Sequence, residues 1–233
     1  MMLDMISPHL TLSSMSTFLL LAITLCLIVP QFFWFPHDYV HFLTFTNIDK
    51  AYLDTILARH NHLYLYQTFT SLFFHMHFLH WFNNSLMLMF MLTAMEYMWW
   101  PNVLISLLAG VITNIYVTLM FEGIFMGLSG ALAAALGIYI AYIISNWDFL
   151  LANYYDTMIR SSIFAIFMLM LMLVSNNRKS TSLHFIGLGL GVLFGMGLLP
   201  RHVNTPTQSY LSMVFKVLSL ISIVVPVLII MAT

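Results

Sequence analysis

Residues 129–147 read SGALAAALGIYIAYIISNW, and this stretch decides what kind of fold the chain adopts. It contains no Asp, Glu, Lys or Arg. Its length is close to the roughly 20 apolar residues with which a helix crosses a hydrocarbon core of about 30 Å. Six more stretches are similarly long and apolar, with at most one charged residue each, at about 14–35, 78–99, 102–121, 159–175, 183–199 and 209–231. Because backbone polar groups in lipid must be paired internally, these seven stretches predict an all-α polytopic membrane protein built as a helix bundle.

The composition of the whole chain also favours a membrane protein. Of the 233 residues, 61% are hydrophobic and only 6% are charged. A soluble domain is about one quarter charged, so lipid must cover much of this protein's surface. The formal net charge of −1 leaves no basic surface for nucleic acid. We therefore expect the lipid bilayer as a partner and no nucleic acid.

The predicted helices divide the chain into three parts. Residues 1–13 are a short N-terminal tail, 14–199 a core of six helices, and 209–231 an additional transmembrane helix. The only long connection, at about 36–77, is rich in apolar side chains, so we expect it to lie on the membrane surface. No Lys or Arg precedes Lys50, and this favours the secretory pathway, the plasma membrane or a bacterial inner membrane over mitochondria.

Polar side chains at the starts of three predicted helices are the candidates for function, because such groups are costly inside a membrane. These side chains are His80 and Asn84 in 78–99, Ser129 in 129–147, and His184 in 183–199. The three helices cross the bilayer in the same direction, so their N-terminal ends share one leaflet. His80 and Asn84 are four residues apart and therefore lie on one helical face.

Small residues offer a way to bring two of these helices together. Glycines spaced four apart follow His184, and Ser129 is surrounded by Gly and Ala, so the two backbones can approach closely. A serine beside a neutral imidazole is a nucleophile with its general base. His80 and Asn84 nearby could stabilise the oxyanion of a tetrahedral intermediate, together with a free N–H at the start of the Ser129 helix. Each feature taken alone is more often ordinary helix packing.

Taken together, these motifs resemble those of the rhomboid intramembrane serine proteases. The resemblance covers about residues 66–195 and rests on three motifs in the family's order: His80-Trp-Phe-Asn-Asn84, Gly127-Leu-Ser129-Gly130, and His184-Phe-Ile-Gly187-Leu-Gly-Leu-Gly191. Glu96 also falls where the family carries a glutamate near the end of its second helix. The seventh predicted helix resembles the six-plus-one arrangement of many eukaryotic members.

The resemblance implies a function and a role for each residue. Ser129 would be the nucleophile and His184 its general base, with His80, Asn84 and Gly127 binding the oxyanion and the substrate. The substrates would be transmembrane proteins, and neither a metal nor another cofactor is expected. Because peptide hydrolysis needs water, polar side chains near the start of the second helix are expected to line a wet cavity: His75, His77, His80, Asn83 and Asn84.

Two departures from the family pattern bear on activity. The first loop carries Tyr66-Gln67 where the family often has Trp-Arg, which weakens the expected anchoring of that loop. One turn after Ser129, many members place an aromatic residue that stacks on the catalytic histidine, and here that residue is Ala133.

Two other functions are compatible with the same residues. One is a non-proteolytic rhomboid-like protein that binds membrane clients, which would share the fold and differ only in activity. The other is a metal or haem protein that uses His75, His77 and His80, since neutral imidazole is a common ligand. The metal reading is the weaker one, because His75 and His77 would project to different faces of a helix and no carboxylate cluster accompanies them.

Overall fold

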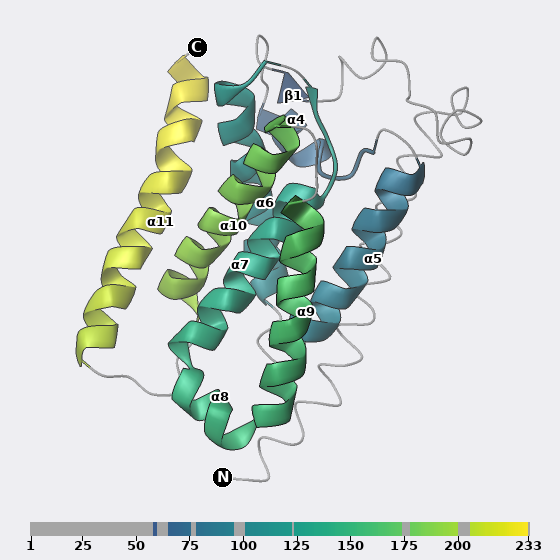
Figure 1. Ribbon diagram of the computed structural model, residues 1–233. Helices are drawn as coiled ribbons and strands as arrows, with labels where there is room; N and C mark the ends of the chain where they lie inside the picture. The colour runs from purple at the N-terminus through teal and green to yellow at the C-terminus, as the bar shows by residue number, and fades with distance from the viewer. Residues whose placement is uncertain are drawn as a thin grey trace.

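The computed structural model of the chain describes residues 58–59, 65–75, 78–95, 101–122, 124–173, 178–199 and 206–232 (Figure 1). The predicted N-terminal tail, the first predicted helix at 14–35, most of the loop at 36–77 and Glu96 lie outside these residues.

Long helices occupy six of the stretches predicted from the sequence. They are α5 (Phe78–Met95), α6 (Pro101–Met120), α7 (Ser129–Ser145), α9 (Tyr155–Leu173), α10 (Arg178–Leu198) and α11 (Pro206–Ala232). Within the described residues, the segments Asn102–Met120, Arg178–Leu198 and Ser209–Ala232 are each long and apolar enough to cross a membrane. A fourth span results if α7 is counted with α8 (Trp147–Asn153), although the two helices meet at 80°. The chain is a helical integral membrane protein.

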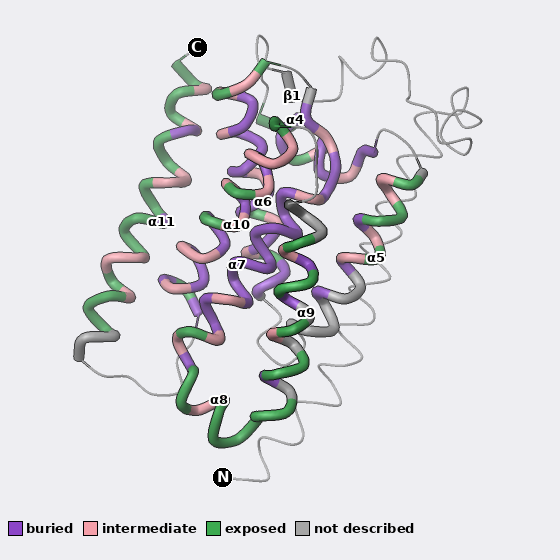
Figure 2. The backbone as a smooth tube through the Cα atoms, viewed as in Figure 1, coloured by how far each residue is buried: buried purple, intermediate pink, exposed green. Residues whose placement is uncertain are grey.

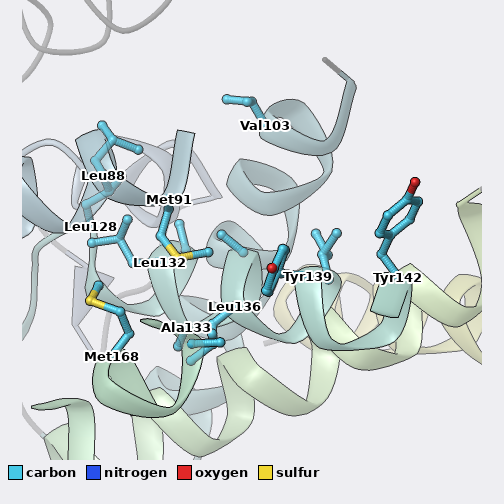
Figure 3. Close-up of a cluster of buried hydrophobic side chains, with 14 of the residues drawn as sticks. Leu88, Met91, Val103, Leu128, Leu132, Ala133, Leu136, Tyr139, Tyr142 and Met168 are labelled. Carbon is cyan, nitrogen blue, oxygen red and sulfur yellow. The ribbon is translucent and has the colours of Figure 1, made fainter. Parts of the chain in front are cut away.

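α7 lies at the centre of the bundle, with α5, α6, α9 and α10 around it (Figures 1 and 2). All residues from Gly130 to Tyr139 are buried. Leu132 and Leu136 pack with Met91 of α5 and Met168 of α9 in one apolar cluster (Figure 3). α7 is thus covered by protein from Gly130 to Tyr139, and the many small residues in this part allow its neighbours to come close.

The closest of these neighbours is α10, which runs parallel to α7. Three pairs of positions face each other along the two helices: Gly187 and Gly130, Gly191 and Ala134, and Gly195 and Ile138. The members of each pair are 57 residues apart, so one register holds over the whole contact. The glycine ridge that the sequence suggested as a packing surface therefore packs against α7.

Short elements cover the end of the bundle at which α7 begins. β1 (Ala58–Arg59) pairs antiparallel with β2 (Ile124–Phe125), and Ala58 lies opposite Phe125. α4 (Leu65–Thr70) contacts α6 nearby (Figure 1). These contacts join the predicted first loop to the segment that leads into Ser129.

α11 packs on α10 and α6, on the side of the bundle away from α5 (Figure 1). Pro226 lies inside α11 and has no N–H, so the carbonyl of Ser222, four residues earlier, loses its helical donor. The hydroxyl of Tyr116 on α6 donates a hydrogen bond to that carbonyl at 3.2 Å. Tyr116 thus supplies the donor that the proline removes.

Tyr116→Phe is expected to lower the free energy of unfolding by about 1 kcal/mol, a typical contribution of one hydrogen bond between membrane helices. This loss corresponds to a decrease of about 2–4 °C in the midpoint of thermal unfolding in detergent. Tyr210→Phe is a matched control, because Tyr210 lies on α11 with 69% of its surface exposed. Equal midpoints for the two variants would contradict this role of Tyr116.

Candidate active site

The register between α7 and α10 places the candidate nucleophile and base at the same end of the bundle. His184 lies three residues before Gly187 and therefore on the same side of α10, the side that faces α7. The offset of 57 residues sets Ile186 level with Ser129, the first residue of α7, so His184 lies two residues, about 3 Å along the helix axis, from the level of Ser129. The neighbouring Leu183 also contacts α7, since its Cγ is 3.5 Å from where a Cβ on Gly130 would stand. Ser129 and His184 are both half-buried.

The two polar side chains of α5 converge on the residue just before this pair. A Cβ built on Gly127 would lie 2.8 Å from Nε2 of His80 and 3.2 Å from Nδ2 of Asn84. His80 is half-buried and Asn84 is 3% exposed. The amide nitrogen Nδ2 of Asn84 is buried and has no hydrogen-bond partner among the residues that the structure describes. It is therefore a donor already directed at Gly127 and free to bind another group.

Gly127 has a left-handed backbone conformation, and its N–H is already bonded within the protein. Its φ is +103°, a conformation that L side chains rarely adopt. Its N–H donates to the carbonyl of Ser71 at 2.8 Å and is not available to a substrate. The sequence suggested Gly127 as a binding residue. In the structure, any side chain at this position would collide with His80 and Asn84.

Gly127→Ala is expected to reduce any activity of this site by at least about tenfold. An alanine methyl would occupy the space in front of His80 and Asn84, and the strained φ would cost about 1–3 kcal/mol. Gly189→Ala is the control, because a Cβ there meets nothing within 4 Å. The rate of substrate turnover per folded molecule measures the effect. A turnover rate of Gly127→Ala within twofold of that of Gly189→Ala would show that activity does not need the empty space beside His80 and Asn84.

His75 has a different place from the one the sequence predicted. It is 1% exposed, and its ring meets that of His80 edge to face, with centroids 4.9 Å apart and planes at 75°. Asn83 lies on an exposed face of α5, and His77 lies outside the described residues. His75 and Asn83 therefore do not line one accessible surface with Asn84. His75 instead packs against the His80 ring and limits its rotation.

The two departures from the family pattern have structural counterparts. In α4, Gln67 is 3% exposed and Tyr66 is 56% exposed, so the glutamine is the inward-facing residue of the pair. Ala133 is 1% exposed, and its Cβ is 3.2 Å from where a Cβ on Gly187 would stand. The alanine lies in the close contact between α7 and α10, which small residues on both helices make possible.

One charged side chain connects the start of α10 to this end of the bundle. Nζ of Lys179 donates a hydrogen bond to the backbone carbonyl of Glu122, in the segment between α6 and α7. This bond lies on the same side of the protein as Ser129. Among the residues that the structure describes, no three His, Cys, Asp or Glu side chains gather as metal ligands, and His77 is not among those residues.

Comparison with known proteins identifies the family of the chain. The sequence model of the rhomboid domain matches residues 62–201, which are 140 of the 233 residues. The chain finds no match among curated proteins. The matched segment runs from just before α4 to just beyond α10 and contains His80, Asn84, Ser129 and His184. Since it covers more than half of the chain, the protein belongs to the rhomboid family.

Proposed function

We propose that this protein is an intramembrane serine endopeptidase that cleaves transmembrane segments of other membrane proteins. The observation that carries the proposal is the convergence of His80 and Asn84 on Gly127, two residues before Ser129 and at the end of the bundle where α10 carries His184. A nucleophile, a base and two donors for an oxyanion are the parts that acyl transfer requires. The membership of the rhomboid family supports the same reaction, because most members are intramembrane serine proteases.

In the proposed mechanism, neutral His184 accepts the proton of the Ser129 hydroxyl as Oγ attacks the carbonyl carbon of the scissile bond. The carbonyl oxygen becomes an oxyanion in the tetrahedral intermediate. The intermediate collapses to an acyl-enzyme, and His184 returns its proton to the leaving amine. A water molecule then attacks the acyl-enzyme with His184 again acting as base, and this step releases the second product and restores Ser129.

Asn84 suits the oxyanion role because its Nδ2 is buried and has no partner in the described part of the chain. A donor left unsatisfied in a buried site costs about 1–3 kcal/mol, and a developing negative charge beside it recovers that energy in the transition state. Its position is fixed by α5, so little reorganisation is needed during the reaction. His80 provides the second donor, held by the edge-to-face contact with His75.

The start of α7 adds backbone donors to the same place. The first described helical bond of α7 runs from the N–H of Leu132 to the carbonyl of Leu128. The N–H groups earlier in the first turn, including that of Ser129, have no carbonyl available within the helix. The helix N-terminus also carries partial positive charge, which favours an oxyanion.

The proposed architecture follows from the family. Six helices would form the catalytic core, and α11 would be the additional C-terminal span. A substrate helix must unwind to present a carbonyl to Ser129, so we expect substrates whose spans contain helix-destabilising residues. The substrates would enter from the bilayer, in which both proteins are embedded.

The test is co-expression of the protein with a single-span substrate whose transmembrane segment contains Gly and Pro. Cleavage by the wild type and none by Ser129→Ala, at equal levels in the membrane, is the expected result. Cleavage by both would contradict the proposal. A substrate bound by the wild type but never cleaved, over a panel of such segments, would instead favour a client-binding rhomboid protein.

A further inference from the structure

A group of buried polar side chains lies between α4 and α6, and it includes Thr68, Ser71 and Asn114. Each of the three is at most 1% exposed. Nδ2 of Asn114 donates to the carbonyl of Thr68 at 3.1 Å and to Oγ of Ser71 at 2.9 Å. Oγ of Ser71 in turn donates to the carbonyl of Thr68 at 3.2 Å. A single amide on α6 therefore holds a turn that is more than 40 residues away in the sequence.

These bonds complete the C-terminal end of α4, where carbonyls run out of helical donors. The carbonyls of Gln67, Phe69 and Thr70 accept backbone N–H groups from the following turn. The carbonyl of Thr68 accepts the side chains of Asn114 and Ser71 instead. Asn114 is thus part of what fixes the position of the turn that follows α4.

The same turn holds the loop that leads into the candidate site. The carbonyl of Ser71 accepts the N–H of Gly127 at 2.8 Å. Gly127 is the residue on which Nε2 of His80 and Nδ2 of Asn84 converge. A continuous path therefore runs from the Asn114 amide through Ser71 to the backbone of Gly127, and it ends beside the two oxyanion donors.

We propose that Asn114 is a positioning residue for the oxyanion site, which it controls through Ser71 and Gly127. The inference rests on the proposed protease function and adds a residue that touches neither the substrate nor Ser129. Its amide sets how far the Gly127 backbone stands from His80 and Asn84. Without the Asn114 amide, the turn after α4 can shift and Gly127 with it. His80 and Asn84 would then no longer both lie beside the position of the oxyanion.

The experiment measures how fast a fluorophosphonate probe labels Ser129 in purified protein in detergent. In this reaction Oγ forms a bond to phosphorus, fluoride leaves, and His184 takes the proton, so the rate depends on the oxyanion site without a peptide substrate. The rate constant reports the geometry of each active molecule. The final extent of labelling reports what fraction of the molecules is folded.

Asn114→Ala is expected to lower the labelling rate constant about tenfold, the upper range for the loss of a hydrogen-bonded group. Ser71→Ala removes one of the two acceptors of the Asn114 amide and is expected to lower the labelling rate constant about threefold. The double variant should lose less than the product of the two, because both side chains act on the same turn. With a peptide substrate, kcat should fall while KM stays within twofold.

Ser106→Ala is the matched control, because Ser106 is a buried residue of α6 whose hydroxyl donates within its own helix to the Asn102 carbonyl. It should keep the wild-type rate constant. A purely structural role for Asn114 would reduce the extent of labelling and leave the rate constant unchanged, and that result would overturn the inference. If Asn114→Ala does not fold, the labelling of Ser71→Ala tests the inference instead: a lower rate constant supports it, and a lower extent at an unchanged rate constant overturns it. Wild type that remains unlabelled would overturn the proposed function, and this inference with it.

Discussion

Ser129→Ala, His184→Ala and the double variant are expected to cleave a transmembrane substrate equally slowly, at least about 1000-fold more slowly than the wild type. The two side chains act as one unit, because the hydroxyl is a weak nucleophile until the imidazole takes its proton. Removing either side chain therefore removes nearly all of the rate acceleration that the two provide together, and the losses from the two substitutions do not add. The cleavage that remains would come from the oxyanion donors and from substrate binding.

The rate should be measured with purified protein and substrate in one detergent, with the product identified by its mass. Ser145→Ala is a suitable control, because Ser145 lies at the other end of α7 and its hydroxyl contacts the sulfur of Met196. That variant should cleave at the wild-type rate. If His184→Ala retained cleavage within tenfold of the wild type while Ser129→Ala lost it, another base would have to be found.

The position of the helices could be predicted from the sequence because the signal is local. Apolar runs about 20 residues long are determined by bilayer thickness, and α6, α10 and α11 begin and end within five residues of the predicted ends. The close packing of α10 on α7 could also be predicted, because glycines spaced four residues apart, at 187, 191 and 195, are typical of close contacts between membrane helices. The parallel direction of α5, α7 and α10 followed from counting the crossings.

The hydrogen bonds that lead to Gly127 and the packing of His75 could not be predicted in this way. The hydrogen bonds of Asn114 and Ser71 join segments more than 40 residues apart, and neither residue stands in a recognisable motif. The edge-to-face contact between His75 and His80 depends on the position of His75, which lies outside any helix and which no periodicity defines. The bend of 80° after Ser145 likewise has no proline or glycine to mark it. Such features depend on the tertiary structure, and a single sequence gives no signal for them.

Two glycines of α10 offer a direct test of the register on which the candidate site depends. A Cβ on Gly191 would overlap the backbone of Ala134, because the two helices touch there without any side chain between them. A Cβ on Gly189, half a turn away, would meet nothing within 4 Å. Both positions lie in the interior of the same helix, so the gain in helix propensity from alanine is the same for both.

Gly191→Ala is expected to lower the stability by about 3 kcal/mol, at the upper end of the range for overpacking, because rigid backbone cannot yield as a side chain can. This loss corresponds to a decrease of about 6–12 °C in the thermal midpoint in detergent, whereas Gly189→Ala should stay within about 2 °C of the wild type. Equal midpoints for the two variants would show that α7 and α10 do not meet in this register. The start of α10 with His184 would then not be held beside the start of α7 with Ser129, so this measurement of stability alone also tests the geometry of the dyad.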